Sequence, residues 1–206
     1  MDCMKSAYRT GIVGGTFDPI HYGHLIIGET AREQLGLDRV IFIPSGNSYM
    51  KQDVTEHIHR LRMTELATCD NPHFSVSDIE INRSGPTYTY ETLLTCKQLY
   101  PDDRFYFIVG ADTLLSISSW KHPEIVLANC TLAVSVREGY PLERLNQETA
   151  ILKDKFNADI TIFTSERYDI SSTVLKDKIR NNQSVKYFIP DLVMDYIRKN
   201  KLYQAK

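Results

Sequence analysis

The sequence predicts an α/β protein with a Rossmann-like, doubly wound, mostly parallel sheet and helices in its C-terminal part. Short, β-branched apolar runs alternate with segments of helical periodicity, and glycine-marked turns follow two of these runs. The chain shows no internal repeat and no low-complexity linker. Its 206 residues, 42% of them hydrophobic, are enough for one well-buried core. We therefore expect a single domain over residues 1–206, with a helical part over roughly residues 165–206.

The expected elements follow one another along the chain. Apolar runs predict strands at 8–13, 39–44, 74–77, 104–109, 131–136 and 160–163, with Ile79 and Ile81 extending the third strand past a bend. Helical spacing predicts helices after Leu25, over 59–69, from a cap at Thr87 or Thr89 to Pro101, briefly before Trp120, and over 142–156, 171–181 and 191–200. This alternation is typical of β-α-β units.

The most informative stretch is Gly14-Gly15-Thr16-Phe17-Asp18-Pro19-Ile20-His21-Tyr22-Gly23-His24, between the first strand and the first helix. Glycines let a ligand lie against the main chain, and the free N–H groups of a first helical turn favour an anion. For the glycine pair alone, a tight turn without a ligand is the alternative. The stretch matches neither the dinucleotide fingerprint nor the Walker P-loop. It predicts a different kind of phosphate site.

His21 and His24 are three residues apart, so within a helix they would share one face and reach the same group. The positive helix end should favour neutral imidazole rings, which still donate one N–H hydrogen bond each. A metal site is the alternative, but no nearby cysteine or HExxH pattern supplies a third ligand. We expect no metal bound by side chains here.

Composition limits the other function classes. A net charge of -2 gives no basic field, so we expect no nucleic-acid partner and no membrane binding. No apolar run has the length of a membrane span or a signal peptide. The four cysteines are scattered and favour neither zinc nor disulfides, which fits a cytoplasmic location.

Several later positions have both a structural and a functional interpretation. The segment Ile170-Ser171-Ser172-Thr173 opens a helix and either caps it or binds an anion. Asp112 in the turn after Gly110 is a cap or a ligand contact, and the single tryptophan, Trp120, is core packing or a plate for a flat ring. Lys51, in a polar loop, is a solvated lysine or a positive charge for a substrate.

The stretch from Gly14 to His24 resembles the first signature of the nucleotidylyltransferase superfamily, (H/T)-x-G-H, in the form found in bacterial nicotinate mononucleotide adenylyltransferases. The segments Tyr88-Thr89-Tyr90-Glu91-Thr92-Leu93, Gly110-Ala111-Asp112 with Trp120, Ile170 to Lys176, and the tail around Tyr187 are similar to that family's later motifs, in the same order. Three departures stand out: Lys176 replaces the family's arginine, Glu91 replaces an aspartate, and Lys51 lacks the preceding Pro-Pro-His.

The resemblance implies a role for each matching residue. It implies that His21 and His24 are catalytic, as electrostatic clamps. It implies ATP binding by Gly14, Gly15, Thr16, Phe17, His21, His24, Gly110, Asp112, Ile170, Ser171, Ser172, Thr173 and Lys176. It implies substrate binding by Gly15, Lys51, Thr89 and Trp120, with the threonine beside the nicotinate carboxylate and the indole on the pyridine ring.

The activity implied by the resemblance is adenylyl transfer from ATP to nicotinate mononucleotide, giving deamido-NAD and pyrophosphate in NAD biosynthesis. Mg²⁺ would be held mainly by the ATP phosphates. The alternative acceptors are nicotinamide mononucleotide and phosphopantetheine, and the alternative of another class is a non-catalytic nucleotide-binding sensor. The sequence leaves the oligomeric state open, with a homo-oligomer among the options.

Overall fold

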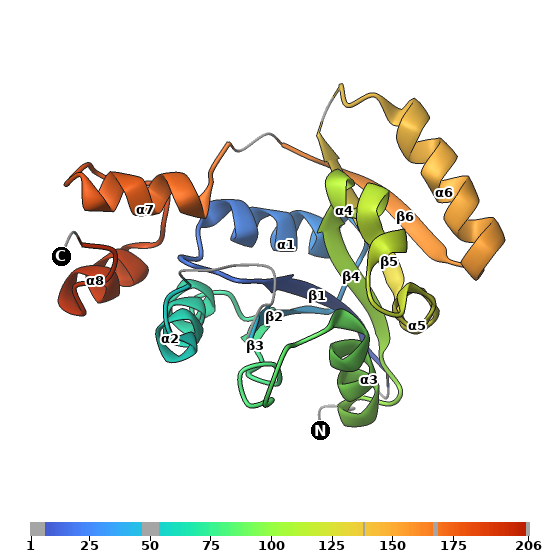
Figure 1. The fold of residues 1–206 in the computed structure, drawn as a ribbon, viewed down its shortest axis with the longest axis horizontal. Helices are drawn as coiled ribbons and strands as arrows, with labels where there is room; N and C mark the ends of the chain where they lie inside the picture. The colour runs from blue at the N-terminus through green and yellow to red at the C-terminus, as the bar shows by residue number, and fades with distance from the viewer. Residues whose placement is uncertain (1–6, 47–53, 138, 167–168, 205–206) are drawn as a thin grey trace. The chain divides into compact units, whose positions relative to one another are not determined.

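The computed structural model describes residues 7–46, 54–137, 139–166 and 169–204 (Figure 1). Six strands form one sheet: β1 (Arg9–Gly15), β2 (Arg39–Pro44), β3 (Phe74–Val76), β4 (Arg104–Gly110), β5 (Thr131–Arg137) and β6 (Asp159–Ser165). Their order is β3-β2-β1-β4-β5-β6, and β1–β4, β4–β5 and β5–β6 pair in parallel. This is the order of a doubly wound Rossmann-like sheet, so the predicted fold class is confirmed.

Among the described residues, the helices are α1 (Tyr22–Gln34), α2 (His57–Thr68), α3 (Thr89–Leu99), α4 (Ala111–Ser116), α5 (Pro123–Asn129), α6 (Leu142–Phe156), α7 (Ser172–Arg180) and α8 (Asp191–Lys199), with a 3₁₀ turn at Ile117–Ser119. Helices α1 to α6 lie between strands in the sequence, and α7 and α8 follow the last strand. The ends have local causes: Gly36 follows α1 with φ 59°, and α6 stops at Asn157, whose φ is 51°.

The chain divides into two compact units. The first unit comprises Met1–Val13, Ile27–Val40 and Tyr88–Arg167, and the second comprises Gly14–Ile26, Ile41–Thr87 and Tyr168–Lys206. Each unit is described by itself below. The prediction of a single domain over the whole chain stays a prediction.

In the first unit, β4 and β5 are buried over almost their whole lengths, as expected for strands covered on both faces. Helix α6 packs on β6 and on α4, and α3 packs on α5 (Figure 1). A polar cluster lies where β1 and β4 begin: Asp103 accepts hydrogen bonds from Thr10 Oγ1 (2.6 Å) and Arg39 (2.6 Å). The Arg39 guanidinium also lies over the ring of Tyr100, 4.5 Å from its centroid.

In the second unit, α2 packs on β3 and on α8. Phe42 of β2 contacts Phe74 of β3, with ring centroids 4.9 Å apart, and His59 Nδ1 is 2.9 Å from the Tyr196 hydroxyl of α8. The buried face of α2 includes one charged residue, Arg60, together with Met63, Thr64 and Ala67. These contacts fix α2 as the support beneath the loops that follow β1 and β2 in this unit.

Three local predictions are wrong. Strand β3 ends at Val76 and does not extend to Ile79 and Ile81. The chain instead forms a turn there, in which the backbone N–H and the side-chain amide of Asn82 both donate to Asp78. Helix α3 is preceded by Tyr88 and has no side-chain cap bond, so neither Thr87 nor Thr89 caps it. Helix α5 was not predicted, although Pro123 at its first position is a common start signal.

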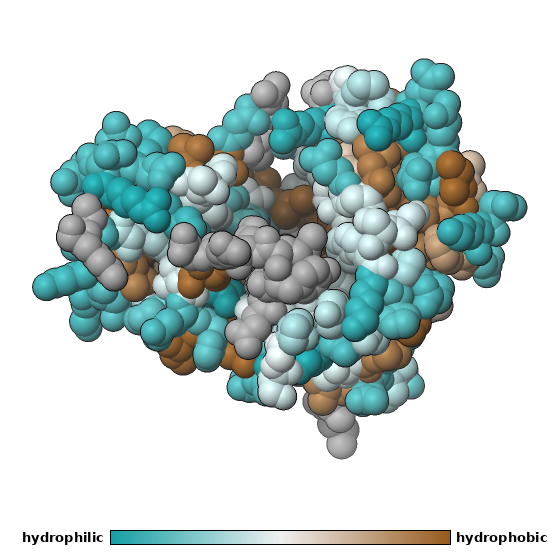
Figure 2. All heavy atoms as spheres, in the orientation of Figure 1, coloured by the Kyte–Doolittle hydropathy of each residue, from teal (hydrophilic) through white to brown (hydrophobic). Residues whose placement is uncertain are grey.

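The surface is ordinary for a globular protein. Figure 2 shows hydrophilic side chains over most of the visible face, with apolar side chains gathered in scattered patches. The exposed large apolar residues come from several helices, among them Ile58, Leu99, Ile151 and Leu192. Within the described residues, every helix is too short or too polar to cross a bilayer.

We expect Asp103→Ala to destabilise the protein by about 2–3 kcal/mol, because it removes a charged acceptor from the buried Thr10 hydroxyl and from the part-buried Tyr8 N–H and Arg39 guanidinium. Asp102→Ala is the matched control, since Asp102 is the adjacent residue and is exposed. Urea unfolding of both variants checks the difference. Equal free energies of unfolding in the two variants would contradict the role given to this cluster.

Candidate functional site

The loop after β1 folds tightly against its own side chains. Phe17 has φ 50° and is buried, with its ring 6.1 Å from Phe42 and edge-on to His24 at 5.0 Å. A Cβ on Gly15 would lie 2.7 Å from the Phe17 ring, so this position needs glycine. The Asp18–Pro19 peptide bond is cis. Backbone and glycine, rather than long side chains, therefore form the wall of the predicted phosphate loop.

His21 and His24 stack on one another at the start of α1, with ring centroids 3.7 Å apart and planes at 22°. The His21 backbone N–H donates to His24 Nδ1 (3.3 Å). With Nδ1 acting as acceptor, the neutral His24 ring carries its proton on Nε2. The prediction that the two rings share one face is confirmed.

Burial sets the protonation state of His21. It lowers the pKa of the His21 imidazole to about 4, so the ring is neutral near pH 7. We had predicted neutral rings from the positive helix end, whereas the structure assigns the His21 shift mainly to desolvation. His21 can therefore donate one hydrogen bond without carrying a charge.

The second predicted anion-binding segment begins α7. Ser171 precedes the helix but its side chain makes no cap bond, so the capping interpretation is wrong. Instead, Ser172 Oγ donates to the carbonyl of Pro19 (2.9 Å). This bond fastens the start of α7 to the loop after β1, so two helix starts meet within the second unit.

A buried carboxylate joins these parts. Asp18 is 4% exposed and accepts from Lys176 Nζ (3.0 Å), the Tyr203 hydroxyl (2.6 Å) and the Thr55 backbone N–H (3.3 Å). Burial alone would raise the pKa of the Asp18 carboxyl, but these donors outweigh burial and hold the pKa below its usual value. Burial and the Asp18 charge raise the pKa of the Tyr203 hydroxyl. The carboxylate is thus ionised and fully engaged.

These elements surround a cavity of about 460 Å³ that lies wholly within the second unit. Nine residues line it: Gly15, Thr16, Phe17, Asp18, His24, Val54, Ser172, Thr173 and Lys176. All but Asp18 and Val54 were predicted to bind ATP or substrate. Gly14, which is exposed, and Ser171 are next to lining residues in sequence, whereas Ile170 is two residues from Ser172 and His21 is three from both Asp18 and His24. The cavity offers two helix starts, hydroxyls and one ammonium group, which together suit an anion.

Four other predicted residues belong to the first unit. Thr89 is the first residue of α3, Gly110 precedes α4, and Asp112 is exposed in the first turn of α4. Trp120 is partly exposed and meets Phe107 edge-on, with centroids 6.3 Å apart. Their assignment to the ATP and substrate sites stays a prediction. Lys51 lies outside the described residues.

Sequence reasoning missed two residues that shape the cavity. Tyr203 holds Asp18 from near the C-terminal end, and Arg60 donates to the carbonyls of Thr16, Thr55 and Gly46. Tyr203 gives no local signal because its partner is 185 residues away. Arg60 does give one: it is a charged residue at a position of α2 where the helical period requires a buried side chain.

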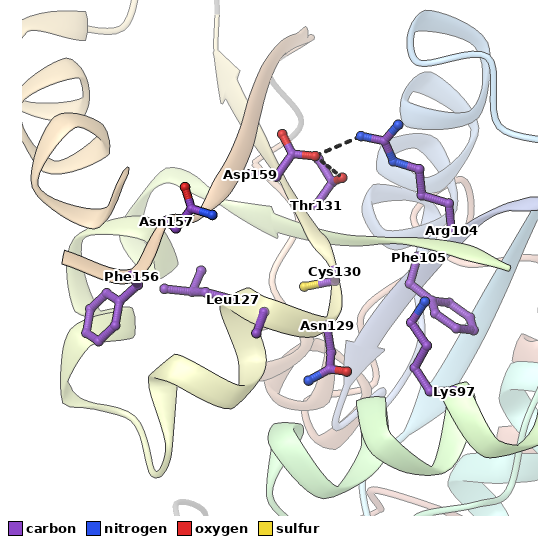
Figure 3. A pocket seen from close by; sticks show the side chains of 11 residues that line it. Lys97, Arg104, Phe105, Leu127, Asn129, Cys130, Thr131, Phe156, Asn157 and Asp159 are labelled. Carbon is purple, nitrogen blue, oxygen red and sulfur yellow. Dashed lines mark hydrogen bonds and ion pairs between the residues drawn. The ribbon is translucent and has the colours of Figure 1, made fainter. Parts of the chain in front are cut away.

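The first unit has a cavity of its own, of about 370 Å³ (Figure 3). It lies by the amino ends of β4 to β6, where Arg104 and Thr131 donate to Asp159, at 2.8 and 2.7 Å, and Lys97 Nζ donates to the Asp103 carbonyl. Burial raises the pKa of the Cys130 thiol to about 12, which keeps this thiol protonated. None of the predicted site residues lines this cavity.

The part of the chain that the structure describes contains no group of three or more His, Cys, Asp or Glu side chains able to hold a metal ion. The two histidines of the motif face one another as stacked rings rather than as convergent ligands. The described oxygen atoms in the cavity come from Thr16, Ser172, Thr173 and the engaged Asp18. An ion that enters with its own phosphate ligands suits this donor set better than one held by protein alone.

The comparison with protein families gives the class. A family model described as cytidylyltransferase-like matches residues 12–178, which include the Gly14–His24 motif, the α7 start and the cavity between them. A nucleotidyltransferase is the class that this fold and this anion cavity define.

Individual relatives identify the family within this class. A probable nicotinate-nucleotide adenylyltransferase from Moorella thermoacetica is 41% identical over 209 residues, covering 100% of this chain and 96% of its own. The one from Lachnoclostridium phytofermentans is 40% identical over 197 residues, covering 95% and 98%. A solved nicotinic acid mononucleotide adenylyltransferase from Plasmodium falciparum, complexed with NaAD, has a TM-score of 0.77, 26% identity and coverage of 95% and 97%. The chain belongs to the nicotinate-nucleotide adenylyltransferase family.

We expect the stability of the protein to fall as the pH drops from 6.5 toward about 4, because the unfolded His21 ring takes up a proton there that the folded ring refuses. The contribution is fully present above pH 6.5. Urea unfolding across this window checks it, with His21→Gln expected to flatten the slope. An equal slope in the variant would show that other groups cause the loss.

Proposed function

We propose that the chain transfers the adenylyl group of ATP to nicotinate mononucleotide, releasing pyrophosphate and forming deamido-NAD. The observation that carries the proposal is the cavity of the second unit, where the loop after β1, His24 and the start of α7 converge. The names of the relatives and the NaAD complex of the Plasmodium protein support the choice of substrates. The product links ATP consumption to NAD biosynthesis.

The cavity would hold the phosphates of ATP. Its backbone N–H groups and the hydroxyls of Ser172 and Thr173 can donate to phosphate oxygens, and Lys176 supplies the charge. His24, which also lines the cavity, would donate from Nε2, and His21, stacked on it, would donate one ring N–H. Such fixed donors stabilise the charge that builds on the α-phosphate and the departing pyrophosphate.

The reaction depends little on proton transfer by the protein. The nucleophile is a phosphate oxygen of nicotinate mononucleotide, largely ionised near neutral pH because its second pKa is roughly 6. It bonds to the α-phosphorus as the bond to the bridging oxygen breaks, and pyrophosphate leaves. A neutral His21 therefore serves as a hydrogen-bond donor and not as a base. Catalysis would come from in-line positioning and charge stabilisation.

Mg²⁺ is part of the proposal as an ion held mainly by the ATP phosphates. When bound there, it would neutralise phosphate charge. The cavity fits an ion delivered in this way, since its Asp18 carboxylate is already occupied by Lys176 and Tyr203. The chain's own contribution is to orient the triphosphate around that ion.

Recognition of the nicotinate half rests on Gly15, Thr89, Trp120 and Lys51. Thr89, at the first position of α3, presents a hydroxyl and a helix start, which suit a carboxylate. The partly exposed indole of Trp120 suits a flat ring. A homo-oligomer and a cytoplasmic location also stay predictions; the free thiols of Cys69, Cys96 and Cys130 agree with the latter.

The direct test is pyrophosphate release by the full chain with ATP, Mg²⁺ and, in parallel, nicotinate mononucleotide, nicotinamide mononucleotide or phosphopantetheine. We expect the highest kcat/KM with nicotinate mononucleotide. Faster release with one of the other acceptors would replace the proposed substrate. Binding of ATP and mononucleotide without any pyrophosphate release would instead identify a non-catalytic sensor.

We expect His24→Ala to lower kcat/KM by about 10²–10³-fold, as for the loss of one preorganised donor, with a much smaller effect on folding. His57→Ala is the control, because His57 is an exposed histidine at the start of α2. Steady-state kinetics and Tm of both variants give the comparison. Parallel losses of Tm and activity in His24→Ala would refute the clamp role.

A further inference from the structure

Arg60 is a buried arginine that faces backbone carbonyls of the loop after β1 and of both ends of the segment between β2 and α2. It is 2% exposed and lies on the packed side of α2 with Met63 and Thr64. Its guanidinium donates to the carbonyls of Thr55 (2.9 Å), Thr16 (2.8 Å) and Gly46 (3.3 Å). Burying a charge costs free energy, so packing alone does not explain an arginine at this position.

The bond to Thr16 orients the phosphate loop. The Thr16–Phe17 peptide is planar and trans, so its C=O and N–H point in opposite directions. With the carbonyl turned to Arg60, the Phe17 N–H points away from Arg60. Thr16 and Phe17 both line the anion cavity, whereas Arg60 does not. The guanidinium thus contacts this loop without lining the cavity, and it fixes the orientation of the Thr16–Phe17 peptide.

Gly46, the second residue after β2, packs closely against neighbouring backbone. A Cβ on Gly46 would lie 2.2 Å from the carbonyl oxygen of Glu80, so the chain passes directly over that backbone. The adjacent Ser45 N–H donates to the carbonyl of Gly15 (2.8 Å), at the end of β1. The first residues after β2 are therefore bonded to the end of β1, and both segments are bonded to the same guanidinium.

We propose that Arg60 is a positioning residue for the anion site: its guanidinium fork fixes the carbonyls of Thr16, Gly46 and Thr55, and so presents the Phe17 amide to the phosphates. This inference rests on the proposed function for the identity of the nucleotide, but it concerns the anion site itself. Only a planar fork with several N–H groups reaches three carbonyls at once. A lysine would keep the buried charge and lose the simultaneous contacts.

The test compares Arg60→Lys and Arg60→Gln with Arg62→Lys and Arg62→Gln in the full chain. Arg62 lies two residues away on the same helix, is exposed and pairs only on the surface, with Glu65. The readouts are Tm, affinity for inorganic pyrophosphate by calorimetry, and kcat and KM for ATP with nicotinate mononucleotide. Pyrophosphate binding reports on the anion site even if the wild-type protein does not use nicotinate mononucleotide.

We expect Arg60→Lys to stay folded at the assay temperature and to lose about 100-fold in kcat/KM, the size of effect that a small misplacement of a binding group produces. Its pyrophosphate affinity should fall with it, and Arg60→Gln should behave likewise, while both Arg62 variants match wild type. Wild-type affinity for pyrophosphate in folded Arg60→Lys overturns the proposal. So does unfolding of both Arg60 variants, which would assign Arg60 to folding alone.

Discussion

The buried carboxylate of Asp18 is the interaction on which the second unit depends. Its donors are Thr55, Lys176 and Tyr203, which lie 37, 158 and 185 residues away along the chain. One charged acceptor thereby joins the loop after β1 to α7 and to the C-terminal segment. Removing Asp18 would leave all three donors without this acceptor, which is why the arrangement depends on the one carboxylate.

Around this carboxylate the site relies on uncharged donors. His21 is neutral because it is buried, and its stacked partner His24 receives the His21 backbone N–H on Nδ1. The start of α7 is held to the loop by Ser172. Neutral donors and helix starts can be buried at lower cost than several free cations, and they stay in place when the anion leaves. The cavity therefore presents donors that are already in place, rather than only a high density of positive charge.

The sequence was sufficient for the parts of the structure that local patterns determine. The central strands β4 and β5 are continuous apolar runs, and α6 has the predicted bounds, 142–156. The motif from Gly14 to His24 could be singled out, and residues 15–18 and His24 do line a cavity, because glycines and a helix start are local features. The partners of Asp18 and the three carbonyls held by Arg60 could not be predicted, since they depend on how distant segments meet. Burial of His21, which sets its pKa, is equally non-local.

Lys176 is the departure from the family motif that the structure explains best. The resemblance places an arginine here, whose fork could bridge two phosphate oxygens. In this chain the ammonium is bound to Asp18 at 3.0 Å and is 18% exposed, so one of its three donors is engaged and the others remain within reach of the cavity it lines. Asp18 also offsets the lysine charge while no ligand is bound. A phosphate would thus share the ammonium with Asp18, and the grip on the phosphates must come mainly from the backbone that Arg60 and Asp18 hold in place.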